Sequence, residues 1–323
     1  MAHHLTRCIL SVLLALSATP AAAQPYPNKP IRIIVPYPPG GGADITARPI
    51  AQMLSERWGQ PVIIENRGEA SGMIGADMVA KAPPDGYTLM VSAAAEVALD
   101  AALFPKMPYD PIRDFAPITL ATMTPMALVV HSSVPVTSLK EYIAYARARP
   151  GSMTFGSIGA GSVHHFAGEW LKMLAKVDIV HVPYKGSGPL IVDLLGGHAP
   201  SGFATLLPAL QHVKTGKLRG LAVTTGKRVP LLPDVPAIAE TLPEFDITQW
   251  NAVWAPAGTP KDVFDKLSAE ITRIVQSADY KARMSEQGSE AVSSTPSELA
   301  AFQKAEIEKY RKIAQQANIR ADQ

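Results

Sequence analysis

The sequence predicts an α/β protein of two lobes, each with a mostly parallel sheet flanked by helices. Short apolar runs rich in Val and Ile alternate with amphipathic runs along most of the 323 residues, a pattern typical of βαβ units. Two extended segments interrupt this alternation, and long amphipathic runs close the chain. The predicted strands are IRIIVPY, PVIIENR, YTLMVSA, TPMALVVHS, MTFGS, IVHVPY and LRGLAVT.

Amphipathic segments between these runs predict the flanking helices. Near the C-terminus, Thr259-Pro260 and Thr295-Pro296 each precede such a segment, and they fit an N-cap followed by proline at the first helical position. The predicted helices between strands are DITARPIAQMLSERWG, LKEYIAYARAR, SVHHFAGEWLKMLA and GPLIVDLLGG.

Two extended segments predict crossings between the lobes. DFAPITLATMTPMALVV has Pro125 near its middle, and FDITQWNAVWAPAGTP contains Trp250 and Trp254, which we expect to pack in the core or hinge. Two crossings imply a discontinuous first lobe, 24–124 plus 251–323, and a second lobe, 125–250. Ligands of open α/β sheets bind outside the carboxyl ends of the strands, so two facing lobes predict a cleft at the hinge.

The first 23 residues have the features of a secretory signal peptide. Arg7 precedes a short apolar run, and ATPAAAQ offers small residues for cleavage after Ala23. The apolar run is shorter than the roughly 20 residues that span a bilayer, so we expect export without membrane insertion. Cys8, the only cysteine, lies in this segment, so the mature chain has no disulfide, thiol nucleophile or cysteine metal site.

The charges of the chain are balanced and scattered. The formal net charge is +2, and no run of Lys and Arg is present. Nucleic-acid-binding proteins concentrate basic residues in patches, so we expect no nucleic-acid partner.

A glycine-rich turn follows the first predicted strand, in VPYPPGGGADITAR (Val35–Arg48). One interpretation is a tight connector, in which Asp44 caps its own helix and pairs with Arg48. The other is an anion site, because helix N-termini present N–H donors and glycine lets a ligand approach the backbone. Similar turns occur in NRGEASGMIGAD, TFGSIGAGSVHHF and YKGSGPL. Their convergence at one cleft predicts a site for a small carboxylate.

Enzyme motifs do not fit these turns. GSIGAGS matches neither the nucleophile elbow nor the dinucleotide fingerprint, and no H-E-x-x-H is present, so we expect no cofactor, no metal and no catalysis. His165 and Glu169 have the spacing of a structural pair on a helix surface, whereas His164 could line the cleft. We expect Lys185, an isolated cation, to be solvated.

The chain resembles the Bug family, the periplasmic receptors of tripartite tricarboxylate transporters. The motifs that carry the resemblance are VPYPPGGGADITAR, APPDGYTLM, FGSIGAGSVHH, VHVPYKGSGPLIVDLLGG, LRGLAVTTGKRVPLLPDVPAIAE and WAPAGTP, in this order. The resemblance implies a type II-like periplasmic binding protein, with its ligand held mainly by backbone groups between the lobes. Together with the turns above, it makes the candidate ligand-binding residues Gly40, Gly41, Gly42, Ser71, Gly72, Ser92, Ala93, Ser157, Gly159, Ser162, His164, Tyr184 and Thr205.

Two segments depart from the family pattern. NRGEASG places Glu69 beside the expected carboxylate site, and GGHAPSGFATL replaces a segment that usually carries an acidic residue. Both lie near the predicted cleft, so the ligand could be a di- or tricarboxylate, an acidic amino acid or an aromatic acid. We expect a monomer that delivers its ligand to transporter subunits in the membrane. The alternatives are presentation of the closed form to a sensor kinase, or a cofactor-free exported enzyme that uses the same cleft.

Overall fold

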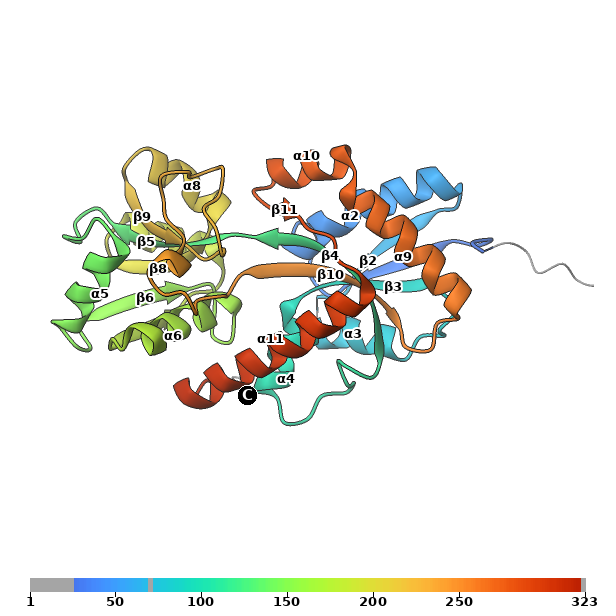
Figure 1. The fold of residues 1–323 in the computed structure, drawn as a ribbon, viewed down its shortest axis with the longest axis horizontal. Helices are drawn as coiled ribbons and strands as arrows, with labels where there is room; N and C mark the ends of the chain where they lie inside the picture. Colours follow the sequence, from blue (N-terminus) through green and yellow to red (C-terminus); the bar gives the residue numbers. More distant parts are fainter. Residues whose placement is uncertain (1–25, 69–71, 321–323) are drawn as a thin grey trace, which may run out of the picture.

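The protein is built around two β-sheets that lie side by side and are joined by long strands (Figure 1). The structure, a computed structural model, describes residues 26–68 and 72–320. The predicted signal peptide, residues 1–23, lies outside this range, as do Glu69 and Ser71.

The first sheet has six strands in the order β11-β4-β10-β3-β1-β2. Strand β1 pairs in parallel with β2 and β3, whereas β10 pairs antiparallel with β3 and β4. Side chains alternate between its faces, so that Trp250 and Trp254 point to one core and Val253 to another. The strands are β1 (Ile31–Val35), β2 (Val62–Asn66), β3 (Thr88–Ala93), β4 (Phe115–Thr124), β10 (Gln249–Pro256) and β11 (Glu290–Ala291).

Helices cover both faces of this sheet. One face packs on α2, α9 and α10, whose apolar side chains share a core with β1 and β3. The other face packs on α3, on the short π-helical turn η2, on α4 and on α11. These elements are α2 (Gly42–Trp58), α3 (Met73–Ala80), η2 (Ala95–Leu99), α4 (Asp100–Leu103), α9 (Lys261–Gln276), α10 (Ala278–Glu286) and α11 (Pro296–Ala317).

The second sheet has five strands in the order β7-β6-β8-β5-β9. Strand β6 pairs in parallel with β7 and β8, and β5 pairs antiparallel with β8 and β9. Helices α5 and α6 pack on one face, and α7 and α8 on the other. The elements are β5 (Met126–His131), α5 (Leu139–Arg147), β6 (Met153–Ser157), α6 (Val163–Ala175), β7 (Ile179–Pro183), α7 (Ser187–Leu195), β8 (Ser201–Thr205), α8 (Leu206–Lys214), β9 (Leu218–Val223) and the 3₁₀ turn η3 (Ile238–Glu240).

The chain changes sheets at the two predicted crossings. Only Pro125 separates the end of β4, in the first sheet, from the start of β5, in the second. The chain returns to the first sheet at Gln249, where β10 begins. Both sheets are mixed, because the crossing strands β4, β5 and β10 pair antiparallel with their neighbours. The lobe boundaries, 24–124 plus 251–323 and 125–250, stay a prediction.

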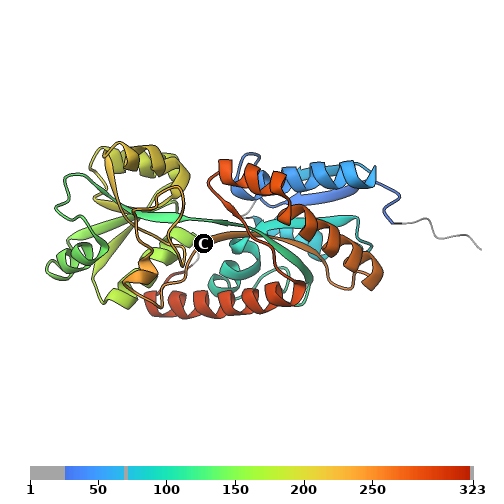
Figure 2. The same cartoon turned by 45° about the horizontal axis from the view of Figure 1, so that its top comes forward.

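Helix α11 runs along the underside of both sheets (Figure 2). In its first half, Gln303 donates from Nε2 to the Val97 carbonyl at 3.0 Å, against the first sheet. In its second half, the Tyr310 ring packs edge-on against Phe166 of α6, with ring centroids 5.2 Å apart. One apolar core therefore extends from the first sheet, along α11, to the second. Trp250 and Trp254 are buried in this core, as predicted.

Candidate functional site

Two sets of strand ends face each other across the crossings. In the first sheet the parallel strands β1, β2 and β3 end at one edge, and Asn251, near the start of β10, lies opposite Ala93 at that edge. In the second sheet β6, β7 and β8 end at one edge, where Met126, at the start of β5, pairs with Thr205. Because Pro125 joins β4 directly to β5 between these edges, the loops that follow both sets of strands lie around the hinge.

The two lobes touch at two positions near these edges. A Cβ atom added to Gly161, in the loop after β6, would lie 3.1 Å from Cδ1 of Leu103 in α4. A Cβ atom added to Gly288, before β11, would lie 2.9 Å from Cβ of Leu207 in α8. Both glycines therefore let a leucine of the opposite lobe approach closely, and a side chain at either position would require that leucine to shift.

The loop after β1 is held by the carboxylate of Asp44. Gly40 has a φ of 83° and donates its N–H to Oδ2 of Asp44 at 2.8 Å. Arg48 donates from Nε to the same oxygen at 2.8 Å, and Asn66 donates from Nδ2 to Oδ1 at 3.0 Å and to the Tyr37 carbonyl at 2.9 Å. Burial alone would raise the pKa of Asp44, but the hydrogen bonds from Arg48, Gly40 and Asn66 lower it overall.

This arrangement decides which backbone donors of the glycine turn remain available. Gly40 donates to Asp44, and Gly41 donates to the Pro38 carbonyl at 3.3 Å. Gly42 is the first residue of α2, where N–H groups have no acceptor within the helix. Asp44 pairs with Arg48, as the connector interpretation expected, but its carboxylate orders the preceding loop and does not cap the helix. The donors left at the helix start are the backbone N–H groups of Gly42, Ala43 and Asp44, because the first helical hydrogen bond is donated by Ile45.

The other first-lobe candidates surround this turn. Gly72, at a φ of 83°, is the residue before α3, and Ser92 is fully buried near the end of β3. The Ser92 hydroxyl has no hydrogen-bond partner among the described residues. Half-buried Ala93 ends β3 opposite Asn251, whose Nδ2 donates to Oγ1 of Thr122 at 2.9 Å. The structure thus brings Gly72, Ser92 and Ala93 to the edge that carries the glycine turn.

In the second lobe, hydroxyl groups of the loop after β6 are used within that loop. Ser157 donates from Oγ to the Gly159 carbonyl at 2.9 Å, and its oxygen lies 2.7 Å from Nε2 of His181. Ser162 donates to the same carbonyl at 2.6 Å and accepts from the His165 N–H as the N-cap of α6. The loop also uses the N–H groups of Gly159 and Ser162, which donate to Oγ of Ser157 at 3.2 Å and to the Gly159 carbonyl at 3.3 Å. Only its remaining backbone N–H groups are left for a ligand.

A stacked pair of histidines supports this loop. The rings of His165 and His181 lie 3.6 Å apart with an interplanar angle of 9°. Nδ1 of His165 accepts from the Gly161 N–H at 3.1 Å, which makes this nitrogen unprotonated in this tautomer. Burial lowers the pKa of His165 to about 3 and that of His181 to about 4, so both rings are neutral at pH 7. His165 is also 3.9 Å from Glu169, consistent with the structural pair expected from the sequence.

His164 and Tyr184 make contacts inside the second lobe. His164 is fully buried, and its Nε2 lies 3.1 Å from Oγ1 of Thr205 at the end of β8. Burial lowers the pKa of His164 to about 3. The Tyr184 hydroxyl donates to Oδ2 of Asp193 at 2.9 Å. Lys185 is exposed, as predicted. The assignment of His164, Tyr184 and Thr205 to a ligand site stays a prediction.

Two buried acids at the first-lobe edge did not enter the sequence prediction. Glu96 in η2 is fully buried and Asp100 in α4 is 5 % exposed, and neither Glu96 oxygen nor Oδ2 of Asp100 has a hydrogen-bond partner among the described residues. Burial, and secondarily Asp100, raises the pKa of Glu96 well above its usual range, and burial raises that of Asp100 to about 7. The sequence does contain a sign of this buried pair, because two acids four residues apart interrupt the apolar run VSAAAEVALDAALF.

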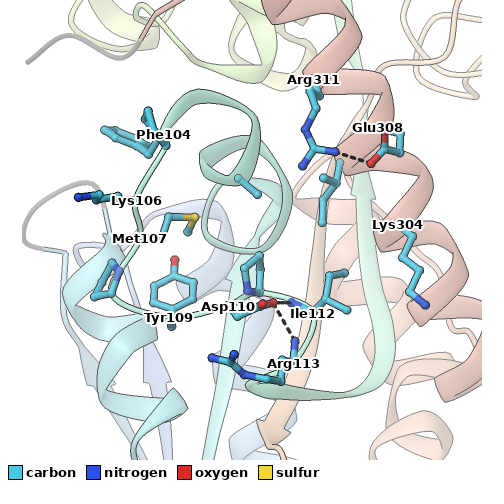
Figure 3. Close-up of a pocket in the computed structure, with 15 residues that line it drawn as sticks. Phe104, Lys106, Met107, Tyr109, Asp110, Ile112, Arg113, Lys304, Glu308 and Arg311 are labelled. Atoms are coloured by element: carbon cyan, nitrogen blue, oxygen red, sulfur yellow. Dashed lines mark hydrogen bonds and ion pairs between the residues drawn. The ribbon is translucent and has the colours of Figure 1, made fainter.

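A surface pocket of about 700 Å³ lies elsewhere, between the loop after α4 and helix α11 (Figure 3). Its walls carry Lys106, Arg113, Lys304 and Arg311, with an apolar floor that includes Ile307. Arg311 is paired there with Glu308. The pocket contains none of the candidate ligand-binding residues.

The described part of the chain contains no group of three or more His, Cys, Asp or Glu residues placed to hold a metal ion. Nor do its helices include one with the length and apolarity needed to cross a bilayer.

Comparisons with known proteins give one consistent result. Residues 46–319 match the family described as "Tripartite tricarboxylate transporter family receptor". BugT of Bordetella pertussis is 36% identical over 312 residues, which cover 95% of this chain and 96% of BugT. An R. palustris protein solved with adipate has a TM-score of 0.78 at 36% identity, with 91% of this chain and 99% of that chain covered. MatC from Rhodopseudomonas palustris, solved with bound malate, has a TM-score of 0.72 at 31% identity, with 89% and 99% covered. These structures confirm the predicted two-lobed binding-protein fold.

Proposed function

Because the chain belongs to the family of tripartite tricarboxylate transporter receptors, we propose that it is a periplasmic receptor that binds a small organic carboxylate. The ligand lies between the two lobes, and the closed protein delivers it to a tripartite tricarboxylate transporter. The signal peptide predicted for residues 1–23 supports this location. Adipate and malate, found with two relatives, are both dicarboxylates, so we expect a dicarboxylate here.

The observation that carries this proposal is the set of backbone donors at the facing edges. Helix α2 begins at Gly42, and a helix start attracts an anion through its N–H groups and its partial positive charge. Two cations near this edge are already paired, Arg48 with Asp44 and Arg67, directly after β2, with Glu65. Recognition through backbone donors, without a dedicated Arg or Lys, therefore fits a carboxylate whose remaining body can vary.

A thermal-shift screen of the purified mature protein tests the ligand class. The screen includes adipate, malate, citrate, glutamate, benzoate and neutral sugars at matched ionic strength. A ligand at 100 times its Kd stabilises the native state by about 2.7 kcal/mol, enough for a clear rise in Tm. Stabilisation by a neutral sugar and by none of the carboxylates would contradict the proposal.

A pair of substitutions at Gly42 tests the backbone-donor mechanism. Gly42→Pro removes one N–H at the first helical position, where proline is well tolerated, and Gly41 already has the extended ψ of 164° that precedes proline readily. Gly42→Ala is the matched control, because its added Cβ meets no atom within 4 Å and the N–H remains. We expect Gly42→Pro to weaken carboxylate binding by about 1.5–3 kcal/mol, the worth of a charge-assisted hydrogen bond. Equal affinity of both variants would show that this donor does not bind the ligand.

A further inference from the structure

Glu96 occupies a junction of three loops at the first-lobe edge. It follows β3 by three residues and lies fully buried, with neither carboxyl oxygen hydrogen-bonded among the described residues. A Cβ atom added to Gly72, in the loop after β2, would lie 2.4 Å from Oε1 of Glu96. The same position is 2.8 Å from the carbonyl oxygen of Pro36, in the loop after β1. Gly72 therefore leaves the space that the Glu96 carboxyl group fills.

The surroundings of Glu96 favour its uncharged form. Burial, and secondarily Asp100 one turn further on, raise its pKa, and they outweigh the Tyr37 hydroxyl from the loop after β1 and the nearby backbone of Glu96 and Ala93, which lower it. Tyr109 adds a hydroxyl, which donates to the Glu96 backbone carbonyl at 2.9 Å, and Asp77 of α3 lies beyond it. Helix α11 packs on η2 through Gln303, which is uncharged. Within the described ranges no Lys, Arg or His pairs with Glu96, so nothing there would balance a negative charge.

We infer that Glu96, as an uncharged carboxylic acid, is a positioning residue for the carboxylate site. Its side chain packs the loops after β1 and β2 against the start of η2, and through Tyr37 and Gly72 it sets the position of the turn that leads to Gly42. The link to ligand binding depends on the function proposed above.

Ionisation would disrupt this packing. A buried carboxylate without a partner is costly, and Asp100 would repel it. The loops must then separate to admit water, which moves the α2 start away from its ligand-bound position. A neutral acid also adds no negative charge beside a site for an anion.

The first test needs no ligand. Amide hydrogen exchange is followed at residues 36–48 and 72–80 between pH 6 and 9.5, with rates corrected for the intrinsic effect of pH. In the wild-type protein we expect protection of these segments to fall at least tenfold as the pH rises, whereas Glu96→Gln keeps it constant. Asp178→Asn, at an exposed aspartate, is the control and should follow the wild type. Equal pH dependence in wild type and Glu96→Gln would overturn the inference.

The second test uses the first dicarboxylate that raises Tm. Its Kd should rise about tenfold per pH unit in alkaline solution for the wild type and stay constant for Glu96→Gln. If no carboxylate binds, the proposed function fails while the exchange measurement still decides the role of Glu96. NMR of protein labelled with ¹³C at glutamate carboxyl groups reports the titration directly. A glutamate signal that titrates above pH 7 and is lost in Glu96→Gln supports the inference, and titration of all glutamates below pH 6 overturns it.

Discussion

Acid should destabilise the protein through His164, whose burial opposes protonation. The folded-state pKa is about 3, whereas an unfolded histidine has a pKa of about 6.5. The unfolded state therefore binds more protons at intermediate pH, and the free energy of unfolding falls as the pH drops below 6.5. At pH 5, about 1.5 units below the unfolded value, this one side chain costs about 2 kcal/mol.

Urea unfolding at pH 7.5 and at pH 5.0 measures this effect in wild type and in His164→Gln. Glutamine keeps a partner for the Thr205 hydroxyl but does not titrate, so the loss of stability between the two pH values should shrink by about 2 kcal/mol. Comparing the two losses cancels any constant cost of the substitution. His198→Gln is the control, because the His198 side chain is 77% exposed, and it should leave the loss unchanged. If the wild type and His164→Gln lose the same stability, the reasoning is wrong.

Two further substitutions test the packing of α6 and the loop after β1. Gly168→Ala places a Cβ 1.9 Å from Cε2 of Phe155, so we expect a loss of about 1–3 kcal/mol in urea unfolding, whereas Gly188→Ala, in α7 with open space, should be neutral or stabilising. Asp44→Asn weakens the bonds to Gly40 and Arg48 and should cost about 1–3 kcal/mol at pH 7. Because the folded pKa of Asp44 is lowered, its contribution is fully present above the unfolded pKa of about 3.9, so the difference from wild type should hold from pH 7 to about pH 4 and narrow below it. A difference that stays constant with pH would contradict this.

Much of the fold could be predicted because it depends on local patterns. The seven predicted strands correspond to β1, β2, β3, β5, β6, β7 and β9, and proline after threonine marked the start of α11. Strand β8, with the sequence SGFAT, was not predicted as a strand. Its small residues have weak strand preference, and it forms because it is buried between β6 and β5.

The site was less predictable because its hydrogen bonds join distant segments. Ser157 was expected to offer its hydroxyl to a ligand, but that group interacts with His181, 24 residues away. The Gly40 N–H was expected in the anion site, yet it donates to Asp44. Which donors a chain uses internally depends on tertiary contacts, and short motifs do not encode these. The position of the glycine turn, by contrast, could be predicted, because the turns that follow parallel strands lie at the same edge of a sheet.

The core shared through α11 has a consequence for how the protein unfolds. In a receptor whose two lobes have separate cores, one lobe can unfold while the other stays folded. Here the core of both sheets includes side chains of α11, residues 296–317. We therefore expect one cooperative transition, with no stable single-lobe fragment. In the export proposed for this chain, the polypeptide would emerge in order from its N-terminus, so neither lobe could complete its core until residues 296–317 have emerged. Premature truncation before α11 would then leave two incomplete lobes instead of one intact half.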